Sequence, residues 1–440
     1  MKTVIMAGGR GTRISSVARD IPKPMIPVDG IPVLEREIAC LREQGYTDLI
    51  LTVSHLGNVI IDYFGDGSGV SPATGKPFGV KIEYFIEKEP LGNAGALFHL
   101  RDKLTEDFLL LNADTAFDVD FHRFVAFHRE KKALATLFTH PNSHPYDSGL
   151  IIADRDHVVQ RWLTKEDPRP DYYPNRVNAG LHVLSPKLLE KTMDTPKIDL
   201  DRQLLKPLAG TGKMFAYDSP EYVKDMGTPD RYQTVCDDIR SGKVSRKNLK
   251  NRQTALFLDR DGTINRYVGF LRDPKEFVLL PGVADAIKKI NASGYLAIVA
   301  TNQPVVARGE VTWEQLGEIH NKMETLLGQE GAYLDAIYVC PHHPHQGYPG
   351  EVRELKIACE CRKPRPGMLL QAAEAFHIDL SRSWMIGDQE SDILCGKAAG
   401  CRTALIGAGT ASYGQTVTAG TLLEAVEQIL KGECCDEWDG

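Results

Sequence analysis

Thr254-Ala-Leu-Phe-Leu-Asp-Arg-Asp-Gly-Thr263 joins a short apolar run to two carboxylates and a Gly-Thr turn. The apolar run predicts a buried strand, with Asp259 and Asp261 at its carboxyl end. At such a position one carboxylate can attack phosphorus while the other protonates the leaving oxygen, and both lie close enough to help bind Mg²⁺. The stretch therefore predicts an α/β domain that carries out phosphoryl transfer.

A second, unrelated phosphate-handling loop opens the chain at Ala7-Gly-Gly-Arg-Gly-Thr-Arg13 and is followed by Pro22-Lys-Pro24. Glycines let backbone N–H groups come close to triphosphate oxygens, while the side chains of Arg13 and Lys23 neutralise phosphate charge. Two such loops in one chain predict two enzymes joined in series. The predicted nucleotide-binding positions in this loop are Gly8, Gly9, Gly11 and Thr12.

The composition is that of a globular enzyme of a reducing compartment. The chain has 440 residues, 42% of them hydrophobic and 25% charged, and its net charge is −7. This length suggests two or three domains, and the negative charge without a basic stripe argues against nucleic-acid binding. No apolar run is long enough to cross a bilayer, and nine cysteines occur without an export signal. We therefore expect a cytoplasmic protein with neither a membrane nor a nucleic-acid partner, of open oligomeric state.

Strand-like apolar runs alternate with amphipathic stretches in both halves of the chain. This alternation predicts an α/β fold with two three-layer α/β/α domains and largely parallel sheets. Residues 241–252 are polar and basic, which is typical of a linker. The predicted organisation is a first domain over 1–240, a linker over 241–252, a second domain over 253–432 and an acidic tail over 433–440.

Three further elements extend the site predicted at Asp259. Thr301 and Asn302 follow another apolar run and offer a hydroxyl and an amide to phosphate oxygens. Lys363 supplies a positive charge for the phosphoryl group, and Asp388 supplies a further carboxylate for Mg²⁺. Active sites in such sheets collect at the carboxyl ends of the strands, so we expect these side chains to converge.

These elements, in this order, resemble the haloacid dehalogenase-like (HAD-like) phosphatases over about residues 253–430. The resemblance implies that Asp259 is the nucleophile that forms an aspartyl-phosphate and that Asp261 is the general acid, then the base. It also implies a Mg²⁺ ion bound by Asp259, Asp388 and the backbone carbonyl of Asp261. No long insertion follows the first motif, so we expect a domain without a cap.

Two ligand pairs predict a metal-binding loop in the same half. Cys340-Pro-His342 and Cys359-Glu-Cys361 are each spaced i, i+2 and are separated by a Gly-, Pro- and His-rich loop. Such a set fits a closed, tetrahedral, structural Zn²⁺ site, for which His343 and His345 compete with the histidine of the first pair. Because Lys363 follows Cys361 by two residues, the metal would pin the loop that carries this cation.

The finer pattern of the second half narrows the resemblance. The run Asp259–Asn265, the Thr-Asn-Gln303 element, the cysteine loop and Arg362 are similar to D-glycero-D-manno-heptose 1,7-bisphosphate 7-phosphatases. Histidinol-phosphate phosphatases share most of these positions and are the runner-up. Arg308 and Arg362 are candidates for binding the phosphate or hydroxyls of the substrate.

The first half resembles the sugar-1-phosphate nucleotidyltransferases, which have a GT-A/Rossmann-like fold, over residues 1–235. Its motifs follow their order: Glu89-Pro-Leu-Gly92, Asn112-Ala-Asp114, Asn178-Ala-Gly180 and Asp225-Met-Gly227. The resemblance implies that Mg²⁺ is bound by Asp114 and Asp225, the base is contacted around Glu89–Gly92, and the sugar phosphate is bound by Lys165 near Asn178 and Gly180. The implied reaction is in-line attack of the sugar phosphate on the α-phosphorus, which releases pyrophosphate without a covalent enzyme intermediate.

The stretch Thr12–Met25 is most similar to heptose 1-phosphate guanylyltransferases. The leading hypothesis is thus a bifunctional enzyme that removes the 7-phosphate of heptose 1,7-bisphosphate and then transfers a nucleotide, GMP from GTP, to heptose 1-phosphate. A second hypothesis pairs a mannose- or glucose-1-phosphate nucleotidyltransferase with a phosphatase for another sugar phosphate or for histidinol phosphate. A third is a regulatory protein that binds nucleotide sugar without turnover, which the complete set of catalytic residues disfavours. The base and the anomer are left open.

Overall fold

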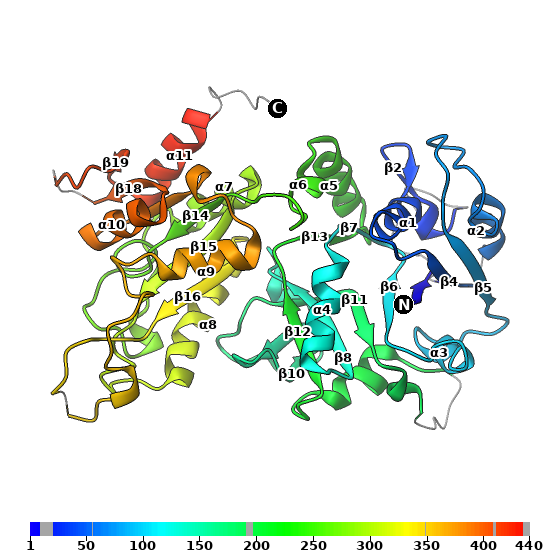
Figure 1. Ribbon diagram of the computed structural model, residues 1–440, viewed down its shortest axis with the longest axis horizontal. Helices are drawn as coiled ribbons and strands as arrows, with labels where there is room; N and C mark the ends of the chain where they lie inside the picture. The colour runs from blue at the N-terminus through cyan, green and yellow to red at the C-terminus, as the bar shows by residue number, and fades with distance from the viewer. Residues whose placement is uncertain (9–20, 55, 191–196, 348, 408–410, 434–440) are drawn as a thin grey trace. The chain divides into compact units, whose positions relative to one another are not determined.

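The computed structural model describes residues 1–440 except 9–20, 55, 191–196, 348, 408–410 and 434–440 (Figure 1). It divides into two compact units. Unit 1 comprises Met1–His140, Ile151–Leu163 and Asn178–Asn248, and unit 2 comprises Pro141–Leu150, Thr164–Val177 and Leu249–Gly440. The division falls inside the segment predicted as a linker. Unit 2 also includes two segments that the predicted domain limits assign to the first domain.

The predicted linker is more ordered than its polar composition indicates. It contains a short helix, α6 (Lys243–Arg246), which is followed by the fully buried Asn248. The Asn248 side chain donates a hydrogen bond to Asp118 Oδ1 at 2.6 Å. Side-chain hydrogen bonds therefore add to the apolar packing of Val244 in holding this polar stretch against its unit.

Unit 1 is built on a mixed sheet. Among the described residues its strands run in the order β10-β9-β11-β6-β1-β4-β5, with β8 and β12 joined beside β11. The neighbours β6, β1, β4 and β5 are parallel, whereas β11 is antiparallel to β6. The strands are β1 Thr3–Met6, β4 Asp48–Val53, β5 Lys81–Ile86, β6 Phe108–Asn112, β8 Ala135–His140, β9 Leu150–Ala153, β10 Val159–Leu163, β11 Val177–Leu184 and β12 Met214–Asp218. Two-stranded ladders pair β7 (Thr115–Asp118) with β13 (Tyr222–Asp225) and β2 (Pro27–Val28) with β3 (Ile31–Pro32).

Alternate residues of these strands face two separate cores. Ile5 belongs to a buried cluster with side chains of α1, α2 and α4, whereas its neighbour Val4 belongs to a cluster with side chains of α3. This alternation is what a sheet covered on both faces requires. The helices are α1 Val33–Glu43, α2 Gly57–Phe64, α3 Gly95–His99, α4 Phe121–Lys131 and α5 Pro229–Arg240.

Unit 2 is built on a parallel sheet with the order β16-β15-β14-β17-β18-β19 among the described residues. Leu256 and Leu258 of β14 pack with α7, α8 and α11, whereas Ala255 and Phe257 pack with α9 and α10. The prediction of three-layer α/β/α domains is thus confirmed. The elements are β14 Ala255–Leu258, α7 Val283–Ser293, β15 Leu296–Asn302, α8 Trp313–Gln329, β16 Ala336–Cys340, α9 Gly367–Phe376, β17 Trp384–Gly387, α10 Glu390–Ala399, β18 Arg402–Ile406, β19 Val417–Ala419 and α11 Leu422–Glu433.

The connection from β14 to α7 contains one short 3₁₀ helix, Pro274–Glu276, and no folded insertion, which agrees with the predicted absence of a cap. No helix in the described part of the chain is long and apolar enough to cross a membrane.

Candidate active sites

The carboxyl ends of three unit 2 strands bring the predicted phosphatase residues together. Asp259 follows β14, Thr301 lies near the end of β15, and Asp388 follows β17. The backbone N–H of Asp259 donates to the Ile386 carbonyl at 2.9 Å, which continues the pairing of β14 with β17. Parallel strands end at one sheet edge, so residues far apart in sequence converge there.

Lys363 lies between two carboxylates at this edge. Its Nζ is 2.6 Å from Asp259 Oδ1 and 2.6 Å from Asp392 Oδ1. The three side chains are almost fully buried. Asp392 lies in the first turn of α10, within the run after β17 that the sequence predicts to supply carboxylates for Mg²⁺, and the structure adds its ion pair with Lys363.

Burial and neighbouring charge determine the protonation of this group. Burial raises the pKa of Asp259 to about 6, an effect that Lys363 partly offsets. For Lys363, burial alone would lower the pKa, but Asp259 and Asp392 outweigh it and the pKa is raised above its ordinary value. Lys363 therefore stays charged and can neutralise both the Asp259 carboxylate and a phosphoryl group.

Asp261 is held by donors on both carboxylate oxygens. Arg260 Nη2 donates to its Oδ2 at 2.7 Å and to its Oδ1 at 3.0 Å, and Gln303 Nε2 donates to Oδ2 at 2.7 Å. Asn265 Nδ2 donates to Oδ1 at 3.0 Å. Burial acts to raise the pKa of Asp261, but Arg260 and these amides outweigh it, so the pKa is lowered. The sequence analysis missed Arg260 and Gln303 as partners of Asp261.

The amide of Asn302 lies against the lysine loop. Its Nδ2 donates to the Lys363 carbonyl at 3.1 Å, and its Oδ1 accepts from the Lys363 N–H at 3.0 Å. Both ends of the side chain thus contact the backbone of this lysine, and the contact with substrate that the sequence predicts stays a prediction. Thr301 is buried, and its hydroxyl accepts from Gln303 Nε2 at 2.9 Å.

The carboxylates around Asp259 fit a divalent cation. Oxygens of Asp259, Asp388 and Asp392 all lie within 4.8 Å of one another. Asp388 Oδ1 is buried and has no hydrogen-bond partner among the described residues, and burial raises the pKa of this carboxyl. Gly262 permits this approach: its φ is +89°, and a Cβ there would lie 2.3 Å from Asp388 Oδ2. Oxygen-only ligands of this kind suit Mg²⁺.

The two arginines proposed to bind substrate are both engaged with neighbours. Arg308 Nε is 2.7 Å from Glu310 Oε1, and its guanidinium stacks on the half-exposed ring of Phe270. Arg362 Nη1 donates to the carbonyl of His342 at 3.2 Å. Arg308 thus lies beside an exposed aromatic ring, and Arg362 is tied to the cysteine loop.

The predicted metal-binding loop closes on itself. Ligand atoms of Cys340, His342, Cys359 and Cys361 all lie within 4.8 Å of one another, and the Sγ atoms of Cys340 and Cys361 are 3.2 Å apart. His342 Nδ1 is 3.2 Å from Cys361 Sγ, whereas His343 contacts the backbone of His345. A hydrogen bond from Cys340 lowers the pKa of Cys361 to about 5. The geometry thus groups His342, and not its two competitors, with the cysteines.

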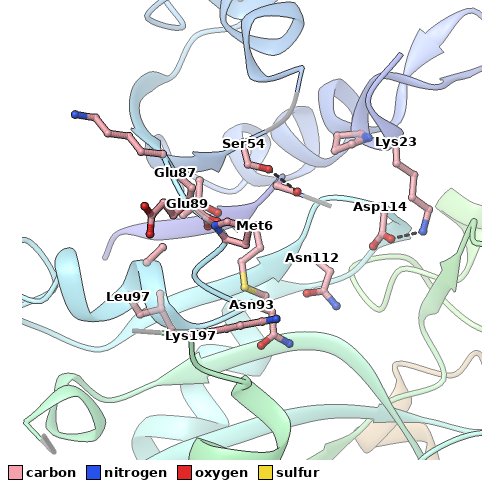
Figure 2. A pocket seen from close by; sticks show the side chains of 17 residues that line it. Met6, Lys23, Ser54, Glu87, Glu89, Asn93, Leu97, Asn112, Asp114 and Lys197 are labelled. Atoms are coloured by element: carbon pink, nitrogen blue, oxygen red, sulfur yellow. Dashed lines mark hydrogen bonds and ion pairs between the residues drawn. The ribbon is translucent and has the colours of Figure 1, made fainter. Parts of the chain in front are cut away.

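A cavity of about 550 Å³ lies at the carboxyl ends of β1, β4 and β6 in unit 1. Figure 2 shows Lys23 and Asp114 paired at one side of this cavity and Glu87 and Glu89 at the other. The predicted residues that line it are Gly8, Lys23, Glu89, Gly92 and Asp114. Gly9, Gly11, Thr12 and Arg13 lie outside the described residues.

The two acidic residues predicted to bind metal are neighbours across a strand pair. Asp225 at the end of β13 is in register with Thr115 of β7, directly after Asp114. Lys23 forms an ion pair with Asp114, whereas Asp225 Oδ2 is 2.6 Å from Arg231 Nη1. Both carboxylates are thus paired with cations, and Asp225 is the more exposed of the two.

A glycine brings the predicted sugar-site residues beside this cavity. Gly180 has a φ of +76°, and a Cβ there would lie 2.4 Å from Asn112 Nδ2, which lines the cavity. Asn178 Oδ1 accepts from the Gly180 N–H at 3.3 Å.

The predicted sugar-phosphate ligand Lys165 does not line the cavity. It is exposed and belongs to the segment Thr164–Val177 of unit 2. Lys197 lines the cavity instead, close to Asn93 (Figure 2). Sequence analysis missed Lys197 because its approach depends on pairing between distant segments: Ile198 N donates to the Leu91 carbonyl at 2.8 Å.

Residues 2–242 match the family model described as nucleotidyl transferase, and residues 360–424 match the model described as HAD-hydrolase-like. The chain belongs to the nucleotidyl transferase family through its first half and to the HAD-like phosphatases through its second, so it is a bifunctional transferase and phosphomonoesterase.

The second half is also similar to individual phosphatases whose substrate is named. The chain is 40% identical over 152 residues to the D-glycero-beta-D-manno-heptose-1,7-bisphosphate 7-phosphatase of Salmonella typhi, which covers 34% of this chain and 79% of that protein. It is 41% identical over 158 residues to the D-glycero-alpha-D-manno-heptose-1,7-bisphosphate 7-phosphatase of Burkholderia mallei, which covers 36% of this chain and 80% of that protein.

Among solved structures, the chain is similar to the crystal structure of HddC from Yersinia pseudotuberculosis. The two are 28% identical, and the match covers 54% of this chain and 99% of that one, with a TM-score of 0.46.

Proposed function

We propose that this chain supplies both steps that activate a heptose phosphate. The second half hydrolyses the 7-phosphate of D-glycero-D-manno-heptose 1,7-bisphosphate, and the first half transfers a nucleotidyl group, GMP from GTP, to the resulting heptose 1-phosphate. The observation that carries the proposal is the Asp259–Lys363–Asp392 group, which occurs in a half similar to heptose bisphosphate 7-phosphatases and shares its chain with a nucleotidyl transferase.

In the phosphatase reaction Asp259 attacks the phosphorus of the 7-phosphate and forms an aspartyl-phosphate. Asp261 gives a proton to the leaving sugar oxygen and then takes one from the water that hydrolyses the aspartyl-phosphate. Since Arg260 and two amides stabilise its anion, Asp261 is well suited to the second role, and protonation for the first must be assisted by substrate binding. Lys363 holds the nucleophile and balances the charge of the phosphoryl group.

Two metal ions fit this half by their ligand chemistry. Asp259 and Asp388, with the carbonyl of Asp261, would hold Mg²⁺, which when bound neutralises phosphate charge. The four residues of the cysteine loop would hold Zn²⁺ in a structural role, because a closed set of three thiolates and one imidazole leaves no position for substrate. The bound metal would fix the position of the cysteine loop, which leads directly into Arg362 and Lys363.

In the transferase reaction the 1-phosphate of the sugar attacks the α-phosphorus of the nucleotide, and pyrophosphate leaves in line. Lys23 and Arg13 would balance the charge of the triphosphate, and Asp114 with Asp225 would hold Mg²⁺. Glu89 and Gly92 line the part of the cavity assigned to the base, and Asn178 and Gly180 would contact the sugar. We expect the enzyme to act in the cytoplasm, because a reducing compartment keeps the thiols of the cysteine loop free for metal.

The experiment that tests the proposal assays each step separately. Purified protein with Mg²⁺ is given the α and β anomers of heptose 1,7-bisphosphate, histidinol phosphate and mannose 6-phosphate, with Asp259→Asn as the inactive control. Pyrophosphate release is then measured for GTP, ATP, CTP and UTP against heptose 1-phosphate, mannose 1-phosphate and glucose 1-phosphate. Preference for the heptose substrates in both assays supports the proposal, and preference for any other sugar or for histidinol phosphate in either assay contradicts it.

A further inference from the structure

The segment Thr164–Val177 lies between β10 and β11 in sequence, yet it packs as part of unit 2. Arg176 Nη1 is 3.0 Å from Glu324 Oε1 on α8, and Arg176 Nη2 donates to the Asp335 carbonyl at 3.1 Å. The side chains of both ion-pair partners are largely buried, 15% and 7% exposed. A phosphatase helix is therefore held by an arginine from the half that matches the nucleotidyl transferase family.

Backbone contacts extend this attachment along α8. The N–H of Asn175 donates to Glu324 Oε2 at 3.3 Å, and the N–H of Tyr173 donates to Thr325 Oγ1 at 2.9 Å. The Thr325 hydroxyl donates in return to the Tyr173 carbonyl at 3.2 Å. One turn further on, Gly328 meets the other such segment, Pro141–Leu150: a Cβ there would lie 2.5 Å from Pro145 Cγ. The attachment thus covers the carboxyl-terminal half of the helix.

One turn before Glu324, the same face of α8 carries His320. Its Nε2 is 3.2 Å from Nη1 of Arg260, whose side chain is fully buried. Burial and then the charge of Arg260 lower the pKa of His320 to about 3, so the ring is neutral and accepts the hydrogen bond. The remaining donors of Arg260 are directed to Asp261.

We propose that Arg176 is a positioning residue of the phosphatase, which acts through Glu324, α8, His320 and Arg260 on the orientation of Asp261. The inference rests on the proposed role of Asp261 as acid and base. α8 is a continuous helix over Trp313–Gln329 that starts with a capping box at Thr312, so it moves as a rigid element. Loss of the arginine would remove the cation that pairs with a largely buried carboxylate, which favours a shift of the helix.

A consequence is that the two activities are not separable at residues 241–252. A phosphatase cut there would lose the segment that holds α8, although it would keep every residue that contacts phosphate. The catalytic unit of the phosphatase therefore extends into the sequence between β10 and β11.

The test uses the full chain with Arg176→Gln, Arg176→Lys and, as a matched control, Arg252→Gln. Arg252 also pairs with a unit 2 carboxylate, Asp379 at 3.4 Å, but it is largely exposed. We expect Arg176→Gln to lower the phosphatase kcat about tenfold with KM within twofold, because the substrate contacts are intact but the acid is misplaced. Arg176→Lys should recover most of the rate, and the control should match the wild type. A kcat within twofold of wild type in Arg176→Gln overturns the proposal.

A double-mutant cycle separates positioning from a general loss of stability. His320→Phe removes the acceptor for Arg260 while roughly keeping the volume, so it breaks the proposed path. In that background Arg176→Gln should lower kcat less than twofold further, since both changes act through one path. Equal fractional losses in both backgrounds would overturn the proposal. Should Arg176→Gln fail to fold, Arg176→Met, which keeps the apolar stem and removes the charge, carries the same comparison.

The assay also separates this inference from the proposed substrate. p-Nitrophenyl phosphate is measured beside heptose 1,7-bisphosphate. Hydrolysis of the first without the second would contradict the heptose assignment, and the Arg176 comparison would still be decided on p-nitrophenyl phosphate.

Discussion

Replacement of Lys363 by methionine is the sharpest perturbation of the phosphatase site. Methionine keeps most of the length and the apolar stem but removes the charge between Asp259 and Asp392. The lysine side chain is 2% exposed and lies 2.6 Å from each carboxylate, so no water can replace the ammonium without a rearrangement. Three carboxylates, with Asp388, would then share one buried region.

The expected effects follow from this geometry. Removing one partner of a buried ion pair typically costs about 3–5 kcal/mol, so the unit 2 unfolding transition should move to clearly lower temperature. Loss of a positioned cation at the phosphoryl group should lower kcat by about 10²–10³-fold. Mg²⁺ should raise the melting temperature of Lys363→Met more than that of the wild type, because it supplies the missing charge.

A second variant distinguishes the two effects. In Lys363→Met with Asp392→Asn, one of the stranded charges is removed, so thermal stability should partly recover while kcat stays low. Lys288→Met, at an exposed lysine that pairs with Asp285, is the control and should change neither property. Calorimetry and phosphate release with saturating Mg²⁺ make the comparison. A kcat for Lys363→Met within threefold of wild type would refute the reasoning.

Three other predictions concern the glycines and the cysteine loop. Gly262→Ala should lower phosphatase activity at least about 100-fold and weaken Mg²⁺ dependence, because its Cβ would collide with Asp388, while pyrophosphate release stays unchanged. Gly180→Ala should impair the transferase instead. Its Cβ would displace Asn112, so the transferase kcat/KM should fall at least about tenfold while phosphatase activity stays unchanged. Equal losses in both assays would contradict this prediction. Cys361→Ser should reduce bound zinc, measured by mass spectrometry of the metal, from one ion per chain to none, and a wild type without zinc would disprove the site.

The architecture of both halves could be predicted from sequence because its signals are local. Short apolar runs such as Ala255–Leu258 predict buried strands, and polar residues that follow such runs must gather at one sheet edge. For this reason the sequence alone places Asp259, Thr301 and Asp388 at one edge. The cysteine pairs were equally readable, since a spacing of two residues places both ligands on one side of a turn.

Contacts that depend on side-chain direction could not be predicted. Arg260 stands between two aspartates in the motif, and only the structure shows that its guanidinium turns back onto Asp261. The structure likewise shows that the amide of Asn302 binds the backbone of Lys363, which the sequence does not indicate. The sequence predicts which residues lie at the edge of the sheet, but it does not predict which neighbour each side chain contacts.

Contacts between segments that are distant in sequence could not be predicted either. No local pattern in Thr164–Val177 indicates that this segment belongs with the second unit, because its attachment depends on one ion pair and a few backbone hydrogen bonds to α8. The same limit applies to Lys197, which reaches the unit 1 cavity through backbone pairing with the segment that follows Glu89.

The central claim is that one chain converts heptose 1,7-bisphosphate to a nucleotide-activated heptose. The most direct test follows a single tube of protein, Mg²⁺, GTP and heptose 1,7-bisphosphate by ³¹P NMR, with Asp259→Asn and Asp114→Asn in parallel. The account predicts that the 7-phosphate signal disappears first and a nucleoside diphosphate sugar then forms. Asp259→Asn should leave the bisphosphate intact, and Asp114→Asn should stop at heptose 1-phosphate. A wild-type enzyme that leaves the 7-phosphate in place, or that forms no nucleotide sugar with GTP or any other nucleoside triphosphate, would contradict it.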